Sequence, residues 1–363
     1  MSVRRAARAP AAHLAFGAGL RRGALSPSPL ALGIALLTAL LTGLAAITFI
    51  DERALKGDWM ATFDGDDFAF LAGAAERGTA DAKDTKDAKD EGPELLIIGS
   101  SALREAILSP QQLGQITGIG RVQTLTAGGL THLEALQLVD HLAPNPGRLV
   151  LLELSERGLS MDTAESQGLI DAPRLPLDGP TFDAAVAAAG LRPRAPRFEA
   201  LALRHARFFL ARPQAIRNLL NGPPQALFHQ ADHLKTASAA DWDRWERRLV
   251  GWFRALPTEA DRNTLLYVKL IEGLRARGGR LALVEAPRNP ALLERALRAE
   301  GAEAGFREGQ RRAQALADAV RAPRWRPAKG IPAQDYVDYA HIITASGRTR
   351  FTEALASQIR GLR

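Results

Sequence analysis

The sequence has no cysteine among its 363 residues. The absence of thiols excludes disulfide bonds, thiolate metal sites and cysteine nucleophiles, and it is compatible with any redox compartment. Hydrophobic residues make up 46% of the chain, which is ample for a packed core and excludes disorder of the whole chain. The length allows one large domain or two domains of ordinary size.

Motifs that bind nucleic acid are also missing. The formal net charge of +7 would favour such a partner, but the arginines lie in separate places along the chain. We therefore predict no nucleic-acid partner.

The N-terminal part of the chain divides into a basic and an apolar segment. The run from Leu30 to Ile50 carries no charge and has about the 20 residues that a helix needs to cross a bilayer. Asp51 and Glu52 follow it. Five arginines precede it: Arg4, Arg5, Arg8, Arg21 and Arg22. The positive-inside rule then places the N-terminus in the cytoplasm and everything after Asp51 outside it.

These features predict a cytoplasmic segment over 1–29 and an uncleaved transmembrane anchor over 30–50. A cleaved signal peptide and a buried core helix are the alternatives. The apolar run is longer than a usual signal core, and no clean Ala-x-Ala site follows it. The protein is therefore expected in the cytoplasmic (inner) membrane, with its C-terminal domain extracytoplasmic or periplasmic.

A solvated tether is predicted over 51–93. From Ala75 to Glu94 the chain alternates Asp and Lys with almost no apolar residues, so it cannot bury enough surface to offset its ordering entropy. The folded domain is expected over 94–362, with a helical insertion at about 160–258.

Short apolar runs after the tether have the pattern of buried parallel strands, and helical patterns alternate with them. The predicted strands are Leu95–Ile98, Val122–Thr126, Leu149–Leu154 and Arg280–Val284. This alternation predicts an α/β fold with a doubly wound, flavodoxin-like parallel sheet, in which ligands bind beyond the carboxyl ends of the strands.

A carboxylate and a histidine lie close together near the end of the chain. Among seven histidines, only His341 has a carboxylate three residues before it, Asp338, and an amphipathic helical pattern just after it. Such a pair can place an imidazole and the carboxylate that orients it on one loop, as a serine nucleophile requires. Ser101, in the turn after the first strand, is the candidate nucleophile. Taken singly, Ser101 could instead be a helix cap and Asp338 a loop acid paired with His341.

Four segments, in order and spacing, resemble the SGNH (GDSL-like) hydrolase superfamily. The resemblance is strongest to its membrane-anchored branch, which includes the D-alanyl transfer protein of teichoic acids and alginate O-acetylation proteins. The segments are Gly99–Ser101, Ala127–Gly129, Val150–Arg157 and Asp338–His341. The match covers roughly Glu94–Leu154 and Gly279–Leu362 and leaves the middle third unexplained.

The resemblance implies roles for individual residues. Ser101 matches the nucleophile, while Ser100 replaces the aspartate of the family's Gly-Asp-Ser turn. Gly128 best matches the glycine whose N–H helps to bind the oxyanion, with Gly129 as the alternative. The N–H groups of Ser101 and Gly128 would form the oxyanion hole, and no cofactor or metal is implied.

One block departs from the family pattern. Where the family carries an oxyanion-binding asparagine, this sequence has Ser155-Glu156-Arg157. Removing one oxyanion donor can cost about 10²–10³ in rate. The hole is therefore weaker, completed by another group such as Arg157, or non-functional. The anchored branch often lacks this asparagine too.

Other histidines carry weaker signals. His229 and His233 are spaced to hold a metal on one helix face, but no third ligand is evident, and we favour the interpretation as a polar helix face. His132 follows the Ala127–Gly129 turn and could reach the site or simply begin a helix.

The middle third of the chain is rich in arginine and has tryptophans near helical spacing. It could be a lid over the sheet edge that binds an anionic polymer or lipid head groups. It could also be a helical subdomain with a tryptophan core.

The sequence thus predicts a membrane-anchored, extracytoplasmic acyltransferase or esterase that acts on O-acyl groups of a cell-envelope carbohydrate. A membrane-bound O-acyltransferase is an expected partner, as a source of acyl groups. The alternatives are a catalytically silent scaffold that binds a polysaccharide or an envelope assembly partner, and a simple secreted esterase or lipase.

The predicted topology is open to a direct test. A reporter that matures only outside the cytoplasm, fused after Arg363, should be active, and the protein should stay with membranes after a carbonate wash. Activity of a cytoplasmic reporter would contradict the orientation, and release on washing would contradict the anchor.

Overall fold

The computed structural model describes residues 29–56, 68, 71, 94–171, 173–175, 177, 179–194 and 238–362. The chain divides into two compact units, Met1–Ala46 and Ile47–Arg363.

The N-terminal apolar run is helical. Helix α1 covers Pro29–Lys56 and contains the predicted anchor segment 30–50. Large apolar side chains such as Leu30 and Leu40 are exposed along it. Within the described part of the chain, no helix is both long enough and apolar enough to cross a membrane. Most of the tether predicted over 51–93 lies outside the described residues.

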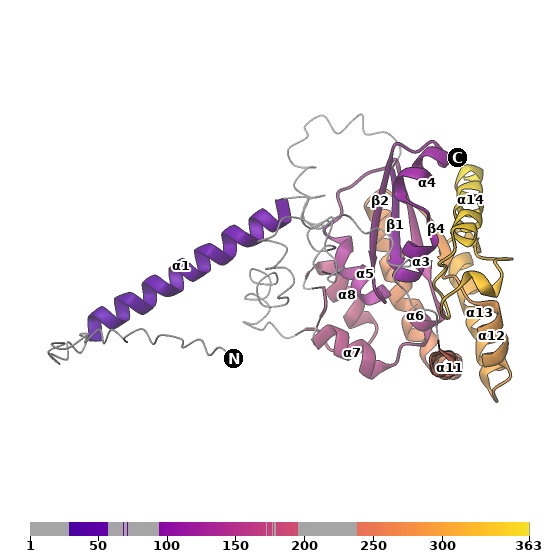
Figure 1. Ribbon diagram of the computed structural model, residues 1–363. Coiled ribbons are helices and arrows are strands. Elements are labelled where there is room, and N and C mark those ends of the chain that lie inside the picture. The colour runs from indigo at the N-terminus through magenta and orange to yellow at the C-terminus, as the bar shows by residue number, and fades with distance from the viewer. Residues whose placement is uncertain are drawn as a thin grey trace, which may run out of the picture. The chain divides into compact units, whose positions relative to one another are not determined.

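A five-stranded parallel sheet forms the centre of the second unit (Figure 1). Its strands are β1 (Glu94–Ser100), β2 (Arg121–Ala127), β3 (Arg148–Leu154), β4 (Arg280–Glu285) and β5 (Arg324–Trp325). They lie in the order β2-β1-β3-β4-β5, which is the order of flavodoxin-like doubly wound sheets. The α/β class and all four predicted strands are confirmed. The fifth strand was not predicted, because two residues are too few to show a periodic pattern.

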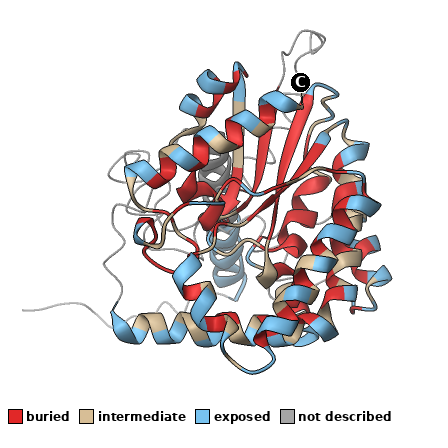
Figure 2. Ribbon diagram, turned by 90° about the vertical axis from the view of Figure 1, so that its right-hand side faces the viewer, coloured by how far each residue is buried: buried red, intermediate tan, exposed pale blue. Residues whose placement is uncertain are grey.

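Helices cover both faces of this sheet, and alternate residues of each strand pack against opposite layers. Leu95 and Ile97 of β1 belong to one apolar cluster, and Leu96 and Ile98 to the other. The first layer contains α3 (Ser101–Ala106), α4 (Pro110–Thr117) and α14 (Ala345–Gly361). The second contains α5 (His132–Val139), α6 (Glu156–Ser160), α7 (Thr163–Asp171), α8 (Pro180–Ala188), α11 (Ala239–Ala276), α12 (Pro290–Leu297) and α13 (Ala302–Ala319). Figure 2 shows the resulting buried strands between the helices.

Helix α11 is longer than the sequence pattern indicates. The pattern predicts a helix over Arg262–Arg277 and places the end of the insertion near Thr258, but α11 runs unbroken for 38 residues with Pro257 inside it. An interior proline normally breaks a helix by removing a hydrogen bond and clashing with the preceding turn. Here Leu256 and Ala260 are buried on both sides of the exposed Pro257, and their packing keeps the two halves in one helix.

Helices α11 and α13 approach each other closely enough to need glycine. A Cβ atom added at Gly305 would overlap the carbonyl oxygen of Phe253, and one added at Gly309 would lie 2.6 Å from a Leu256 methyl group. The backbone of α13 therefore touches that of α11 at Gly305.

Gly305→Ala should destabilise the fold, because a backbone carbonyl cannot move away as a side chain can. We expect a loss of about 1–3 kcal/mol in the free energy of unfolding, as for other overpacked sites. Gly251→Ala is the matched control: it lies in the same helix pair with nothing near its missing Cβ, so it should stabilise α11 by up to about 1 kcal/mol. Denaturant melts of both variants measure the difference, and equal midpoints would refute the close contact.

Candidate active site

Ser101 lies where the chain turns from β1 into α3, at the carboxyl end of a central strand. Ser100 is the N-cap of α3, and its Oγ accepts a hydrogen bond from the N–H of Ala102 at 3.2 Å. The structure thus assigns the predicted capping role to Ser100. It leaves the Ser101 hydroxyl free to hydrogen-bond with His341, the Ser101 Oγ and His341 Nε2 atoms being 2.9 Å apart.

Asp338 orients the histidine. Its Oδ2 is 2.7 Å from His341 Nδ1, and its Oδ1 accepts hydrogen bonds from the N–H groups of Ala340 at 2.8 Å and His341 at 2.7 Å. Both carboxylate oxygens are therefore used within one tight loop. The remaining ring nitrogen, Nε2, faces Ser101.

The Asp338 loop is held by contacts within itself and by Asn289, which precedes α12. An isolated antiparallel bridge joins Tyr336 to Ile342. After β4, the buried Asn289 donates from Nδ2 to the Asp338 carbonyl at 3.1 Å and from its backbone N–H to the Tyr339 carbonyl at 2.8 Å. Asn289 also caps α12, so one side chain ties the helix start to the Asp338 loop.

The electrostatics of this pair favour an ionised aspartate and a basic imidazole. Burial disfavours both charges, yet the hydrogen bond and charge of Asp338 raise the pKa of His341 above its ordinary value. Burial alone would raise the pKa of Asp338, but the hydrogen bond and charge of His341 lower that pKa below its ordinary value. The chain of contacts can therefore accept a proton from Ser101 and stabilise the resulting imidazolium.

A pocket opens beside these groups, where the ends of β1 and β3 meet. It encloses about 530 Å³ of empty space, part of it open to solvent. In a 2-1-3 strand order this is the point where the chain changes direction across the sheet, and such points commonly bind ligands. Its lining includes Ser101, His341, Gly129, Arg157, Leu249, Trp252, Arg288 and Tyr339.

Gly129, the alternative to Gly128, lines this pocket, whereas Gly128 does not. Gly129 has a left-handed φ of 65°, a conformation that glycine adopts without strain. A Cβ there would be 2.6 Å from Arg157 Nη1, so the guanidinium lies directly against the glycine backbone.

Among the described residues that line the pocket, Arg157 and Arg288 carry guanidinium groups, and they differ in their ion pairs. Arg288 forms ion pairs with Glu156 and Glu285. Arg157 makes one long contact, from Nη2 to Glu165 at 3.5 Å, and its side chain is 34% exposed. Arg157 is therefore the cation better placed to meet a developing negative charge or an anionic group in the pocket.

Glu153 is a site residue that the sequence analysis did not single out. It lies in the predicted strand Leu149–Leu154 and lines the same pocket. Its Oε2 accepts from the Ser100 N–H at 2.6 Å, and its Oε1 accepts from the Ser100 hydroxyl at 2.9 Å. Burial raises the pKa of Glu153, and the two hydrogen bonds from Ser100 partly offset that rise. A lone acid in an apolar strand covered on both faces was the signal that could have identified it.

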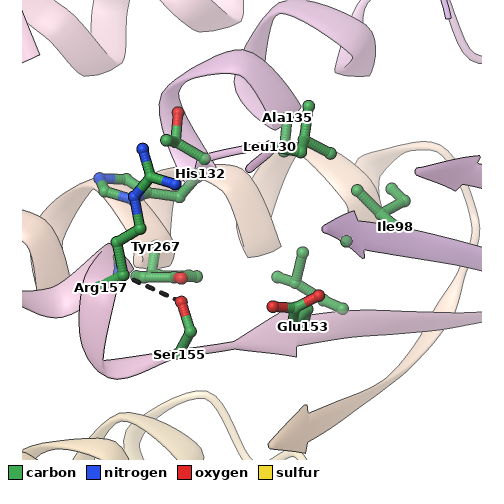
Figure 3. A pocket seen from close by; sticks show the side chains of 12 residues that line it. Ile98, Leu130, His132, Ala135, Glu153, Ser155, Arg157 and Tyr267 are labelled. Atoms are coloured by element: carbon green, nitrogen blue, oxygen red, sulfur yellow. Dashed lines mark hydrogen bonds between the residues drawn. The ribbon is translucent and has the colours of Figure 1, made fainter. Parts of the chain in front are cut away.

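A second, smaller pocket adjoins the first, with Leu130, Glu153, Ser155 and Arg157 in both linings (Figure 3). His132 begins α5 and lines this second pocket but not the one that contains Ser101. Its ring stacks on Tyr267 at 4.7 Å between centroids, and burial lowers the pKa of His132 to about 3. His132 is therefore a neutral, packed helix-start residue that does not reach Ser101.

The other sequence candidates are not joined to this site. His229 and His233 lie outside the described residues. Where side chains are described, no three histidines or acids gather in a way that could hold a metal ion. From the middle third, Trp242, Trp245 and Trp252 are partly buried against the core, as the subdomain interpretation expects, and Trp252 also reaches the pocket.

No protein-family model matches the chain, and no curated protein matches it.

The coupling between Asp338 and His341 can be measured without any substrate. The His341 imidazole should titrate above the ordinary value of about 6.5 in an NMR titration, because the Asp338 carboxylate stabilises its charged form. Asp338→Asn should lower that pKa, whereas Asp318→Asn, an exposed acid on α13, should not. A His341 pKa at or below 6.5 in the unaltered protein would contradict the described pairing.

Proposed function

We propose that this protein is a membrane-anchored, extracytoplasmic serine acyltransferase or esterase that acts on O-acyl groups of a cell-envelope polysaccharide. The hydrogen-bond chain from Ser101 through His341 to Asp338 is the observation that carries the proposal. A nucleophile, a base and a group that orients the base, each within hydrogen-bond reach of the next, are the parts that acyl transfer needs.

The chemistry proceeds in two steps. The Ser101 oxygen attacks the acyl carbonyl carbon while His341 Nε2 takes the hydroxyl proton. The carbon–oxygen bond to the leaving alcohol then breaks, and His341 returns the proton to that alcohol. An acceptor hydroxyl or water next attacks the acyl-serine ester and loses its proton to His341. The bond between the acyl carbon and Ser101 Oγ then breaks, and His341 gives the proton to Oγ, which regenerates Ser101.

The oxyanion formed in each step needs donors. Ser101 is the first residue of α3, so its N–H has no acceptor inside the helix. The second backbone donor is an N–H group of the Ala127–Gly129 turn. Gly129 is a better candidate than Gly128, because Gly129 lines the pocket. Arg157, at the position of the family's missing asparagine, supplies the third contact from its place against Gly129.

The membrane anchor and the cell-envelope substrate in this proposal rest on the sequence. The charge-free segment 30–50, its flanking charges and the polar tether favour an anchored domain outside the cytoplasm. Tethering raises the effective concentration of an enzyme near an integral membrane acyl donor and does little for hydrolysis of a soluble ester. Transfer from a membrane-bound O-acyltransferase is therefore favoured over hydrolysis.

The proposal predicts a graded loss of activity in three variants. The purified full-length protein should hydrolyse a p-nitrophenyl ester slowly, and Ser101→Ala or His341→Ala should lower kcat/KM by at least about 10³-fold. Asp338→Asn should cost less, provided that the loop still holds the imidazole. Ser357→Ala, on the exposed face of α14, is the matched control and should have no effect.

The same variants distinguish transfer from its rivals in cells. Ser101→Ala should leave polymer yield unchanged and reduce its O-acyl content, whereas loss of a deacylating enzyme would increase that content. A third pattern would favour a scaffold. In that case Ser101→Ala would change neither esterase activity, nor acyl content, nor polymer yield, whereas deletion of the whole protein would abolish polymer assembly.

A further inference from the structure

Glu153 is the one carboxylate of the central strand β3, whose other residues after Arg148 are all apolar. It is 8% exposed, and its neighbours in β3 are leucines. Burying a carboxyl group is costly unless hydrogen bonds replace its water shell. Such a residue in the middle strand of a parallel sheet calls for a specific partner.

Its partner is the residue that precedes the nucleophile. The two Glu153 oxygens accept both hydrogen bonds that Ser100 can donate, from its N–H at 2.6 Å and from its hydroxyl at 2.9 Å. The Ser100 oxygen in turn accepts from the Ala102 N–H at 3.2 Å. Glu153 is thus connected to the backbone on both sides of Ser101.

Gly99, which precedes Ser100, leaves room for the Glu153 carboxylate because it has no side chain. A Cβ atom at Gly99 would lie 2.5 Å from Glu153 Oε2 and 2.8 Å from Glu153 Cβ. Any larger residue at position 99 would push the carboxylate away from Ser100. The glycine of the Gly99–Ser101 turn therefore serves the contact with Glu153.

The orientation of Ser100 decides where the next peptide points. Its backbone is extended, with φ −82° and ψ 177°, and the following peptide carries the Ser101 N–H. The same torsions set the position of the Ser101 Cα atom and so of its Oγ, which lies 2.9 Å from His341 Nε2. A displacement of about 1 Å at such a position can cost about 10²-fold in rate.

We infer that Glu153 is a positioning residue, which holds the Ser100–Ser101 turn through two hydrogen bonds so that the Ser101 hydroxyl and N–H face the acyl group. The inference rests on the proposed function for its consequence, but the contact itself can be tested separately.

Glutamine at position 153 separates hydrogen bonding from charge. Its amide oxygen can accept from the Ser100 N–H, and its NH₂ group can donate to the Ser100 hydroxyl oxygen, which has two lone pairs. Alanine removes both contacts. Glu153→Gln should therefore rescue what Glu153→Ala loses, which a role based on the negative charge would not allow.

The experiment measures two quantities on the full-length protein. Backbone hydrogen exchange across residues 99–103 reports the contact, and the rate of Ser101 modification by a fluorophosphonate, located by mass spectrometry, reports the nucleophile. Glu153→Ala should speed exchange by about tenfold or more. It should also slow labelling about 10- to 100-fold. Glu153→Gln should restore both to within about threefold of the unaltered protein.

Glu94 provides the matched control. It is a buried acid at the start of β1, six residues before the end of that strand at Ser100, and it forms an ion pair with Arg148 at 2.6 Å. Glu94→Ala should lower the melting temperature but leave exchange at 99–103 and labelling of the folded protein unchanged. If Glu153→Ala fails to fold, Ser100→Ala removes only the hydroxyl contacts and should change both readouts in the same direction.

The outcomes are separable. Unchanged exchange in Glu153→Ala overturns the contact, and faster exchange with unchanged labelling overturns the positioning role. A Glu153→Gln variant as slow as Glu153→Ala overturns the hydrogen-bond basis. Failure of the unaltered protein to react at Ser101 would overturn the proposed function, while the exchange data would still decide whether Glu153 holds the turn.

Discussion

The parallel register between β1 and β3 is the constraint on which the rest of the site depends. Ile98 pairs with Leu152, so Glu153 comes beside the Gly99–Ser101 turn. Side chains alternate between faces along a strand, and a slip of one residue would turn Glu153 to the other face and place a leucine next to Ser100. The same register packs the leucines and isoleucines of both strands into two separate apolar clusters. Core packing therefore also enforces the geometry of the turn.

The carboxyl ends of three strands, β1, β3 and β4, supply the hydrogen-bonding groups that hold Ser101, Glu153 and Asp338 in the candidate site. β1 leads into Ser101, β3 carries Glu153, and β4 is followed by Asn289, which holds the carbonyl of Asp338. Ser101 and His341 are 240 residues apart in sequence and meet only because these ends share one edge of the sheet. Each buried polar group in this network of hydrogen bonds has a described partner. Such satisfied networks specify a single arrangement, since any displacement leaves a buried donor or acceptor unpaired.

The sequence made part of this architecture predictable, for physical reasons that differ from element to element. Continuous apolar runs identified β1, β3 and β4, because strands buried on both faces need apolar residues along most of their length. The edge strand β2 contains polar residues and was marked by the Ala127–Gly129 turn that follows it. Ser101, Asp338 and His341 could be found because turn position and short spacing are local properties. Glu153 and Asn289 could not be assigned roles in the same way, since their partners are distant in sequence. The course of α11 through Pro257 depended on tertiary packing, which overrides a local helix-breaking residue. Which glycine of the Ala127–Gly129 turn lines the pocket depends on the backbone of that turn, which the sequence pattern does not specify.

The contact between Gly305 and Phe253 bears on the rigidity of one wall of the pocket. Leu249 and Trp252 form part of the pocket wall and lie within about one turn of Phe253 on α11. Backbone contact with α13 at that point leaves α11 no room to slide or rotate without separating the two helices. The fold therefore fixes the position of this wall, and any group that entered the pocket would meet Leu249 and Trp252 where they already lie. The shape of the pocket can change instead at long side chains of the other walls, such as Arg157, which can change rotamer without moving a helix.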